Sequence, residues 1–250
     1  MPQSQAFDGS YVEFVEVHDE PIHRRQFNND FCWIYIAGFR PGETSLWHRH
    51  SENTLYLCVQ NACAALNRPT DKEPFVHHAS PGDLWWAMSK STPYVHQVCL
   101  LPENTHPSIF FAMEILRPPP PELTQAGALE HTCYRLRRED SRAGIARVYD
   151  LKLEPGQSTG WHSLGFMGVI LCLAIGEGKG IVSAGGGAPS GERGAPLDPF
   201  EDGSLSRVGG WKWIEGAEGV NARNDSDGAY EAVVVEWLGE GQVVDNAARL

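Results

Sequence analysis

The stretch Pro41-Gly42-Glu43-Thr44-Ser45-Leu46-Trp47-His48-Arg49-His50 places two histidines two residues apart, directly after a turn. On a β-strand, side chains at positions i and i+2 leave the same face, so His48 and His50 present two imidazoles side by side. Two ligands alone make a loose metal site. A polar turn at Pro81-Gly82-Asp83 leads into an apolar strand and then to His96, early in the returning strand. The pattern predicts one metal ion held by His48, His50 and His96.

These segments resemble the two motifs of the cupin family. The first cupin motif is Pro-Gly, a short gap, His-x-His and then Glu; the second is Gly-Asp, an apolar strand, a Pro-containing turn and His. The positions that fit are Gly42, His48, His50, Gly82, Asp83, Pro93 and His96. The glutamate is missing, because Thr54 stands in its place. The remaining three-histidine set is similar to that of the thiol and diketone-cleaving dioxygenases of the family.

A second copy of the first motif begins at Pro155. The stretch Pro155-Gly156-Gln157-Ser158-Thr159-Gly160-Trp161-His162 repeats residues 41–48 at a constant offset, 155 − 41 = 162 − 48 = 114. A long internal repeat indicates a duplicated unit. Four consecutive prolines, 118–121, exclude a helix interior or a central strand between the copies.

The resemblance and the repeat together predict an all-β bicupin made of two jelly-roll β-barrels. Many short segments rich in aromatic and β-branched residues, joined by Gly/Pro turns, agree with this fold class. We expect a metal-binding N-terminal domain over residues 1–117, a proline-rich linker over 118–128 and a C-terminal domain over 129–250. Residues 1–30 are interpreted as a lead-in to the first barrel.

The second copy lacks the metal-binding residues. Position 50 maps to Leu164 and position 54 to Gly168, and no histidine corresponds to His96. His162 is left alone, and one imidazole cannot hold an ion without partners. The C-terminal domain is therefore expected to be structural, with one metal ion per chain.

The overall charge excludes several classes of partner. The chain of 250 residues has 20 Lys and Arg against 32 Asp and Glu, a formal net charge of -12. This balance argues against nucleic acid, whose phosphates require a basic surface, and against anionic membranes. The longest apolar stretch, residues 166–175, is too short to cross a bilayer.

The N-terminus has neither a basic start nor an apolar run, so no signal peptide is expected. Six cysteines without a Cys-x-x-Cys pair are interpreted as reduced thiols. Together these features predict a cytoplasmic protein.

Several residues near the motifs are candidates for the site. Tyr56 shares a strand face with Thr54, so Tyr56 is expected to point into the cavity or to serve as a core aromatic; Tyr56 and Tyr94 are the candidates for donating a proton or a hydrogen bond. Thr54, Trp86 and Cys58 are expected to line the substrate pocket, although tryptophan and buried cysteine are more often core residues. Glu52 is a weak substitute for the missing carboxylate, because it lies in a turn.

The predicted function is a mononuclear metal enzyme, specifically a non-haem Fe(II) dioxygenase that acts on a small molecule. Zn, Mn, Ni and Cu remain alternatives, because imidazole accepts all of these metals. A metal-dependent lyase, isomerase or hydrolase on the same scaffold, and a non-enzymatic ligand-binding cupin, are the rival functions. A small-molecule substrate and a second copy of the chain, in a homodimer, are the expected partners.

Overall fold

The computed structural model describes the chain except for residues 126, 185–204, 217 and 240–250. The described residues form strands and two short 3-10 helices, with no α-helix among them, which confirms the predicted all-β class. No helix in this part of the chain is long and apolar enough to cross a membrane. Two compact units divide between Leu116 and Arg117, and each is described separately.

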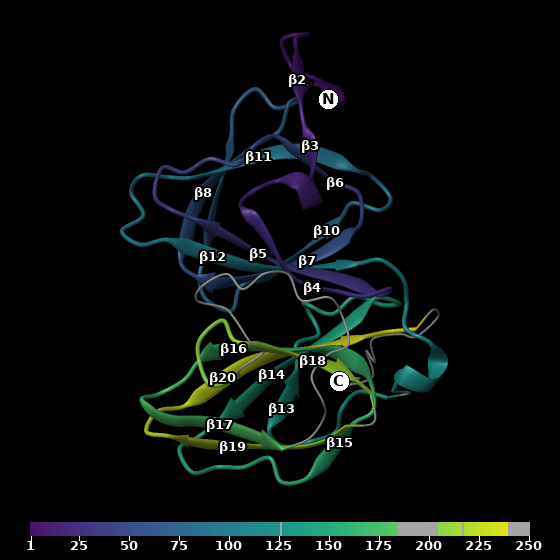
Figure 1. Ribbon diagram of the computed structural model, residues 1–250, viewed down its shortest axis with the longest axis vertical. Coiled ribbons are helices and arrows are strands. Elements are labelled where there is room, and N and C mark those ends of the chain that lie inside the picture. The colour runs from purple at the N-terminus through teal and green to yellow at the C-terminus, as the bar shows by residue number, and fades with distance from the viewer. Residues whose placement is uncertain (126, 185–204, 217, 240–250) are drawn as a thin grey trace, which may run out of the picture. The chain divides into compact units, whose positions relative to one another are not determined.

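The first unit consists of two five-stranded sheets and a short N-terminal hairpin (Figure 1). The first sheet has the order β3 (Val15–Glu16), β6 (His48–His50), β11 (Tyr94–Leu100), β8 (Ala62–Asn67) and β9 (Phe75–Ala79). The second has the order β10 (Leu84–Met88), β7 (Asn53–Gln60), β12 (Ser108–Ile115), β5 (Cys32–Phe39) and β4 (His23–Asn28). The hairpin is β1 (Gln3–Gln5) with β2 (Tyr11–Glu13), and the 3-10 helix η1 covers Val17–Asp19.

The central strands of the second sheet form most of this unit's core. On β7, all six residues from Thr54 to Val59 are buried, and β12 is buried along almost its whole length. Their aliphatic and aromatic side chains suit a pleated surface that is covered on both faces. These strands therefore give a rigid wall opposite β6 and β11, which carry the predicted ligands.

The described residues of the second unit repeat this arrangement with fewer strands. One sheet has the order β13 (Tyr134–Leu136), β14 (Ala146–Leu153), β20 (Tyr230–Trp237), β16 (Met167–Ala174) and β18 (Trp211–Glu215). The other has the order β15 (His162–Leu164), β19 (Glu218–Ser226) and β17 (Gly178–Ala184). The repeated turns share a backbone conformation, since Gly42 and Gly156 have φ of 79° and 76°, a region that favours glycine.

The proline-rich segment is held against the second unit. It contains the 3-10 helix η2 (Pro121–Leu123). The guanidinium of Arg147 donates hydrogen bonds to the carbonyls of Gln125 and Gly127, at 3.3 and 3.0 Å. Because its carbonyls are bound by a buried side chain, this segment is not a free tether.

A buried ion pair lies inside the second unit. The Arg147 guanidinium donates to Glu236 at 2.9 Å, and the Tyr149 hydroxyl donates to the same carboxylate at 2.6 Å. Arg147 and Glu236 are only 2% and 0% exposed. Burial raises the pKa of Glu236 to about 7, although the bonds from Tyr149 and Arg147 oppose this rise.

Replacing Arg147 with Met is expected to destabilise the second unit by about 3–5 kcal/mol at pH 8, because Glu236 is left as an unpaired buried carboxylate. The loss should be smaller at pH 5. The folded pKa of Glu236 exceeds its usual value, so the native state binds the extra proton between pH 4.5 and about 7, and stability falls as the pH rises through this window. Urea unfolding at both pH values measures the difference.

The control is Arg135→Met, which removes an ion pair with Asp150 from a side chain that is 73% exposed. We expect this variant to lose at most about 1 kcal/mol, as is typical of surface pairs. Equal losses of unfolding free energy in the two variants would show that the buried ion pair contributes no more to stability than the exposed one.

Candidate metal centre

Strand pairing brings the three predicted ligands together between the sheets of the first unit. In the register of β6 with β11, His96 lies opposite His48, and Tyr94 lies opposite His50. The ring centroid of His48 is 4.4 Å from that of His96 and 5.0 Å from that of His50, and His50 and His96 are also 5.0 Å apart. All three side chains are buried.

Three ring nitrogens of this cluster lack the hydrogen bonds that buried polar atoms usually make. The Nδ1 of His48 lies 2.8 Å from the carbonyl oxygen of Leu46, to which it donates. The Nε2 of His48 and both nitrogens of His96 are buried with no hydrogen-bond partner among the described residues. Such unsatisfied atoms are costly, and a metal ion that accepts their lone pairs removes the cost.

Burial also keeps these imidazoles in the form that binds metal. It lowers the pKa of His48 to about 4 and holds the pKa values of His50 and His96 well below the usual value. The neighbouring histidines add to the effect in each case. The rings are therefore neutral at pH 7, as metal coordination requires.

A further histidine, which the sequence analysis left in the lead-in, joins the cluster. His23 begins β4, and its ligand atom, with those of His48 and His50, forms a group whose members lie within 4.8 Å of one another. This three-histidine group, which contains His23 and does not include the predicted ligand His96, is consistent with a single metal ion. The number of residues between His23 and the His48-Arg49-His50 motif does not predict that they meet. The sequence shows only that a histidine lies within a charged segment.

The two predicted tyrosines surround His50. The Tyr56 hydroxyl lies 3.1 Å from Nδ1 and 3.3 Å from Nε2 of this ring. Tyr94 stacks on His50 with a centroid distance of 5.6 Å. Burial raises the pKa of Tyr56 well above the usual value, and that of Tyr94 also rises, so both keep their protons at neutral pH.

The structure places the other candidate pocket residues as follows. Thr54 is fully buried, and its hydroxyl donates to the Glu52 carbonyl at 3.0 Å. Trp85 lies opposite Tyr56 and stacks on it at 5.5 Å, whereas Trp86 lies opposite Leu55 and leaves the other face of β10. Trp85, rather than Trp86, therefore faces the site.

Cys58 and Glu52 lie apart from the histidines. The Cys58 thiol donates to the Gln60 carbonyl, belongs to the core cluster around Phe39 and Phe110, and has a pKa raised to about 12 by burial. Cys58 is therefore an inert core thiol. The carboxylate of Glu52 pairs with Lys90 at 3.3 Å.

A carboxylate approaches His50 from the strand next to Thr54. Glu114 on β12 lies opposite Thr54 in the sheet and is 1% exposed. Its Oε2 lies 2.7 Å from the Nε2 of His18, and its Oε1 lies 3.6 Å from the Nδ1 of His50. The site therefore has a buried negative charge beside it, although the carboxylate of the first cupin motif is missing.

The second unit has no comparable histidine group among its described residues. The rings of His131 and His162 are 4.6 Å apart. However, the Nε2 of His131 is bonded to the Thr159 carbonyl and its Nδ1 accepts from the Cys133 amide, while the Nε2 of His162 meets the Tyr134 hydroxyl. These nitrogens are satisfied within the protein.

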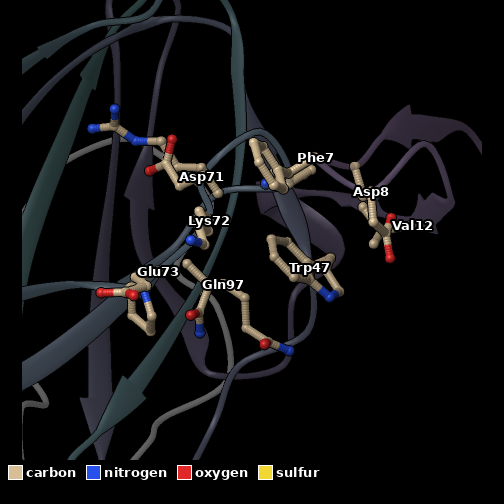
Figure 2. Close-up of a pocket in the computed structure, with 13 residues that line it drawn as sticks. Phe7, Asp8, Val12, Trp47, Asp71, Lys72, Glu73 and Gln97 are labelled. Carbon is tan, nitrogen blue, oxygen red and sulfur yellow. The ribbon is translucent and has the colours of Figure 1, made fainter.

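A pocket of about 460 Å³ lies elsewhere in the first unit (Figure 2). Its lining includes Trp47 and Gln97, the chain neighbours of His48 and His96. Adjacent strand residues point to opposite faces, so this pocket lies outside the sheet whose inner face carries the ligands. It contains none of the clustered histidines.

Acid is expected to destabilise the first unit. Since the folded pKa of His48 is about 4, below its usual 6.5, the unfolded chain binds more protons between these values, and stability falls as the pH drops through this window. From pH 7 to 5, His48 alone should cost about 2 kcal/mol. Urea unfolding of the metal-free protein checks this, and an acid-insensitive first unit would contradict it.

Thr54→Glu is expected to destabilise the metal-free protein, because the new carboxylate would lie across from Glu114 in a buried site. Metal binding should then stabilise this variant more than the wild type, since the ion offsets the added charge. Melting temperatures with and without Co(II) measure both effects. Thr54→Val, which removes only the hydroxyl, is the control and should not show the larger response to metal.

Comparison with known proteins gives structural matches only. No family model and no curated relative matches the chain. AerE from Microcystis aeruginosa matches with a TM-score of 0.53 at 11% identity, over 88% of this chain and 98% of that one. Lactobacillus farciminis oxalate decarboxylase, in a formate complex, matches with a TM-score of 0.53 at 10% identity, over 93% of this chain and 88% of the other.

A salicylate 1,2-dioxygenase from Pseudaminobacter salicylatoxidans also matches, with a TM-score of 0.52 at 12% identity, over 84% of this chain and 72% of the other. At these identities the matches establish the fold and leave the activity open. They span most of the chain, including both units, and so confirm the expected architecture. The protein therefore has the cupin fold in a bicupin-like arrangement, with a three-histidine cluster in its N-terminal part.

Proposed function

We propose that the first unit is a mononuclear metal-dependent enzyme, a non-haem Fe(II) dioxygenase that acts on a small molecule. The observation that carries this proposal is the set of buried imidazole nitrogens on His48 and His96 that have no hydrogen-bond partner among the described residues. Together with His50, they would hold one ion. When bound, Fe(II) would supply a redox-active Lewis acid with positions for substrate and O₂.

The charge of the ligand set favours a particular class of substrate. Neutral imidazoles leave a divalent ion with its full charge, whereas a glutamate at position 54 would offset one unit. An anionic or chelating small molecule would therefore bind most favourably. The resemblance to the thiol and diketone dioxygenases points in the same direction.

The residues around the cluster would shape the reaction. Tyr56 holds its proton next to His50 and would donate a hydrogen bond to a bound substrate. Trp85 and Tyr94 pack against Tyr56 and His50, respectively, and limit the access of water. These aromatic side chains orient the substrate and keep the interior dry.

We expect one tightly bound metal ion per chain after expression in iron-supplemented medium. His96→Ala should lose most of this metal, because it removes a ligand, while His162→Ala should retain it. Elemental analysis of the three proteins measures the ratio. A value near two that survives His96→Ala would overturn the assignment of the site to the first unit.

The dioxygenase assignment is tested by oxygen consumption. The iron-loaded protein should take up O₂ in the presence of a thiol, a 1,3-diketone or a hydroxylated aromatic acid, and the zinc-loaded protein should not. Turnover of these compounds by the zinc form without O₂ uptake would favour a lyase or hydrolase instead.

A further inference from the structure

We propose that His23 is a fourth ligand of this metal ion and that Glu20 is the residue that positions it. The inference rests on the proposed metal centre and adds to it a ligand that neither cupin motif contains. It places part of the N-terminal segment, residues 14–23, in the wall of the site.

The position of His23 suits a ligand. Its side chain is 5% exposed. Its ring centroid is 4.6 Å from that of His48 and 5.9 Å from that of His50. Since β4 belongs to the second sheet and β6 to the first, His23 approaches the cluster from the side opposite His48.

The orientation of the ring is fixed by Glu20. The Nδ1 of His23 lies 2.6 Å from Oε2 of this carboxylate, so Nδ1 carries the proton and donates. In the neutral ring the lone pair is then on Nε2, the nitrogen left to coordinate an ion. A carboxylate that holds a ligating histidine through its other nitrogen is a common second layer of metal sites, which also makes the ligand more basic.

Glu20 is buried and is held in place by several hydrogen bonds. It is 2% exposed. The carboxylate also accepts from the backbone amides of Ile22 and His23, at 2.8 and 3.1 Å, and from the amide of Leu46 at 3.1 Å. Leu46 in turn accepts from the Nδ1 of His48. One buried carboxylate therefore fixes the directions of two histidines that come from different sheets.

The arrangement also balances charge. A buried carboxylate is costly unless it is paired with a positive group or fully hydrogen-bonded. Glu20 supplies one negative charge next to the ligand layer, which Thr54 does not. The ion would therefore be compensated by carboxylates behind the ligating rings, Glu20 behind His23 and Glu114 beside His50, and not by a directly bound glutamate.

Co(II) titration of the metal-free, full-length protein tests the proposal. The wild type should bind one Co(II), and His23→Ala should bind at least about 100-fold more weakly and show a different visible spectrum, because it loses a nitrogen ligand. Added imidazole should restore part of the wild-type spectrum. Glu20→Gln should bind about 10–100-fold more weakly with unchanged band positions, as expected of a residue behind the ligand. His106→Ala, an exposed histidine, is the control and should match the wild type.

The ligands can also be counted in the wild type, so the test does not depend on a variant that folds. In the proton NMR spectrum of the Co(II) protein, each histidine bound through Nε2 gives one strongly shifted, exchangeable ring N–H signal. Four such signals support the proposal, and three overturn it.

The two proposals fail in different ways. If the wild type binds Co(II) and His48→Ala abolishes binding, but His23→Ala leaves affinity and spectrum unchanged, then the metal centre stands and His23 is only a hydrogen-bonded neighbour. If the wild type binds no Co(II), the metal centre and the fourth ligand are both overturned.

Discussion

The antiparallel pairing of β6 with β11 is the constraint on which the site depends. It puts His48 directly opposite His96, at a spacing that an isolated pair of loops would not hold. The second sheet then closes over these residues with side chains that pack tightly and expel water, so the imidazoles lose their solvent partners. Nitrogens without a hydrogen-bond partner destabilise the fold. Burial of the large hydrophobic core around β5, β7 and β12 offsets this unfavourable free energy.

Much of this site could be predicted from the sequence, because the deciding relations are local. The spacing of His48 and His50 fixes a shared strand face, and the Gly-Asp turn before β10 fixes where His96 returns. The duplication was visible because residues 155–162 repeat residues 41–48 in the sequence. In the structure, Gly42 and Gly156 adopt the same positive φ in these equivalent turns. The fold class and the repeat can be predicted from the spacing of apolar residues and from the Gly and Pro residues in turns, both of which can be read in the sequence.

The remaining features depend on contacts between distant segments. His23 reaches the cluster through a cross-sheet approach that no spacing encodes, and Glu20 is explained only by its partners on Leu46 and His23. The choice between Trp85 and Trp86 depends on the register of β10 with β7, and a shift of one residue exchanges their faces. Glu114 likewise becomes visible only when β12 is placed beside Thr54.

The buried carboxylates of the two last strands show how the duplicated units diverged. Glu114 lies opposite Trp33 and Thr54, and Glu236 lies opposite Arg147 and Gly168, so the partners are related by the repeat offset, 147 − 33 = 168 − 54 = 114. In the second unit the position of Trp33 is taken by an arginine, which gives that interior a permanent, covalently attached cation. The interior of the second unit therefore keeps its charge balance whether or not a metal ion is supplied to the chain.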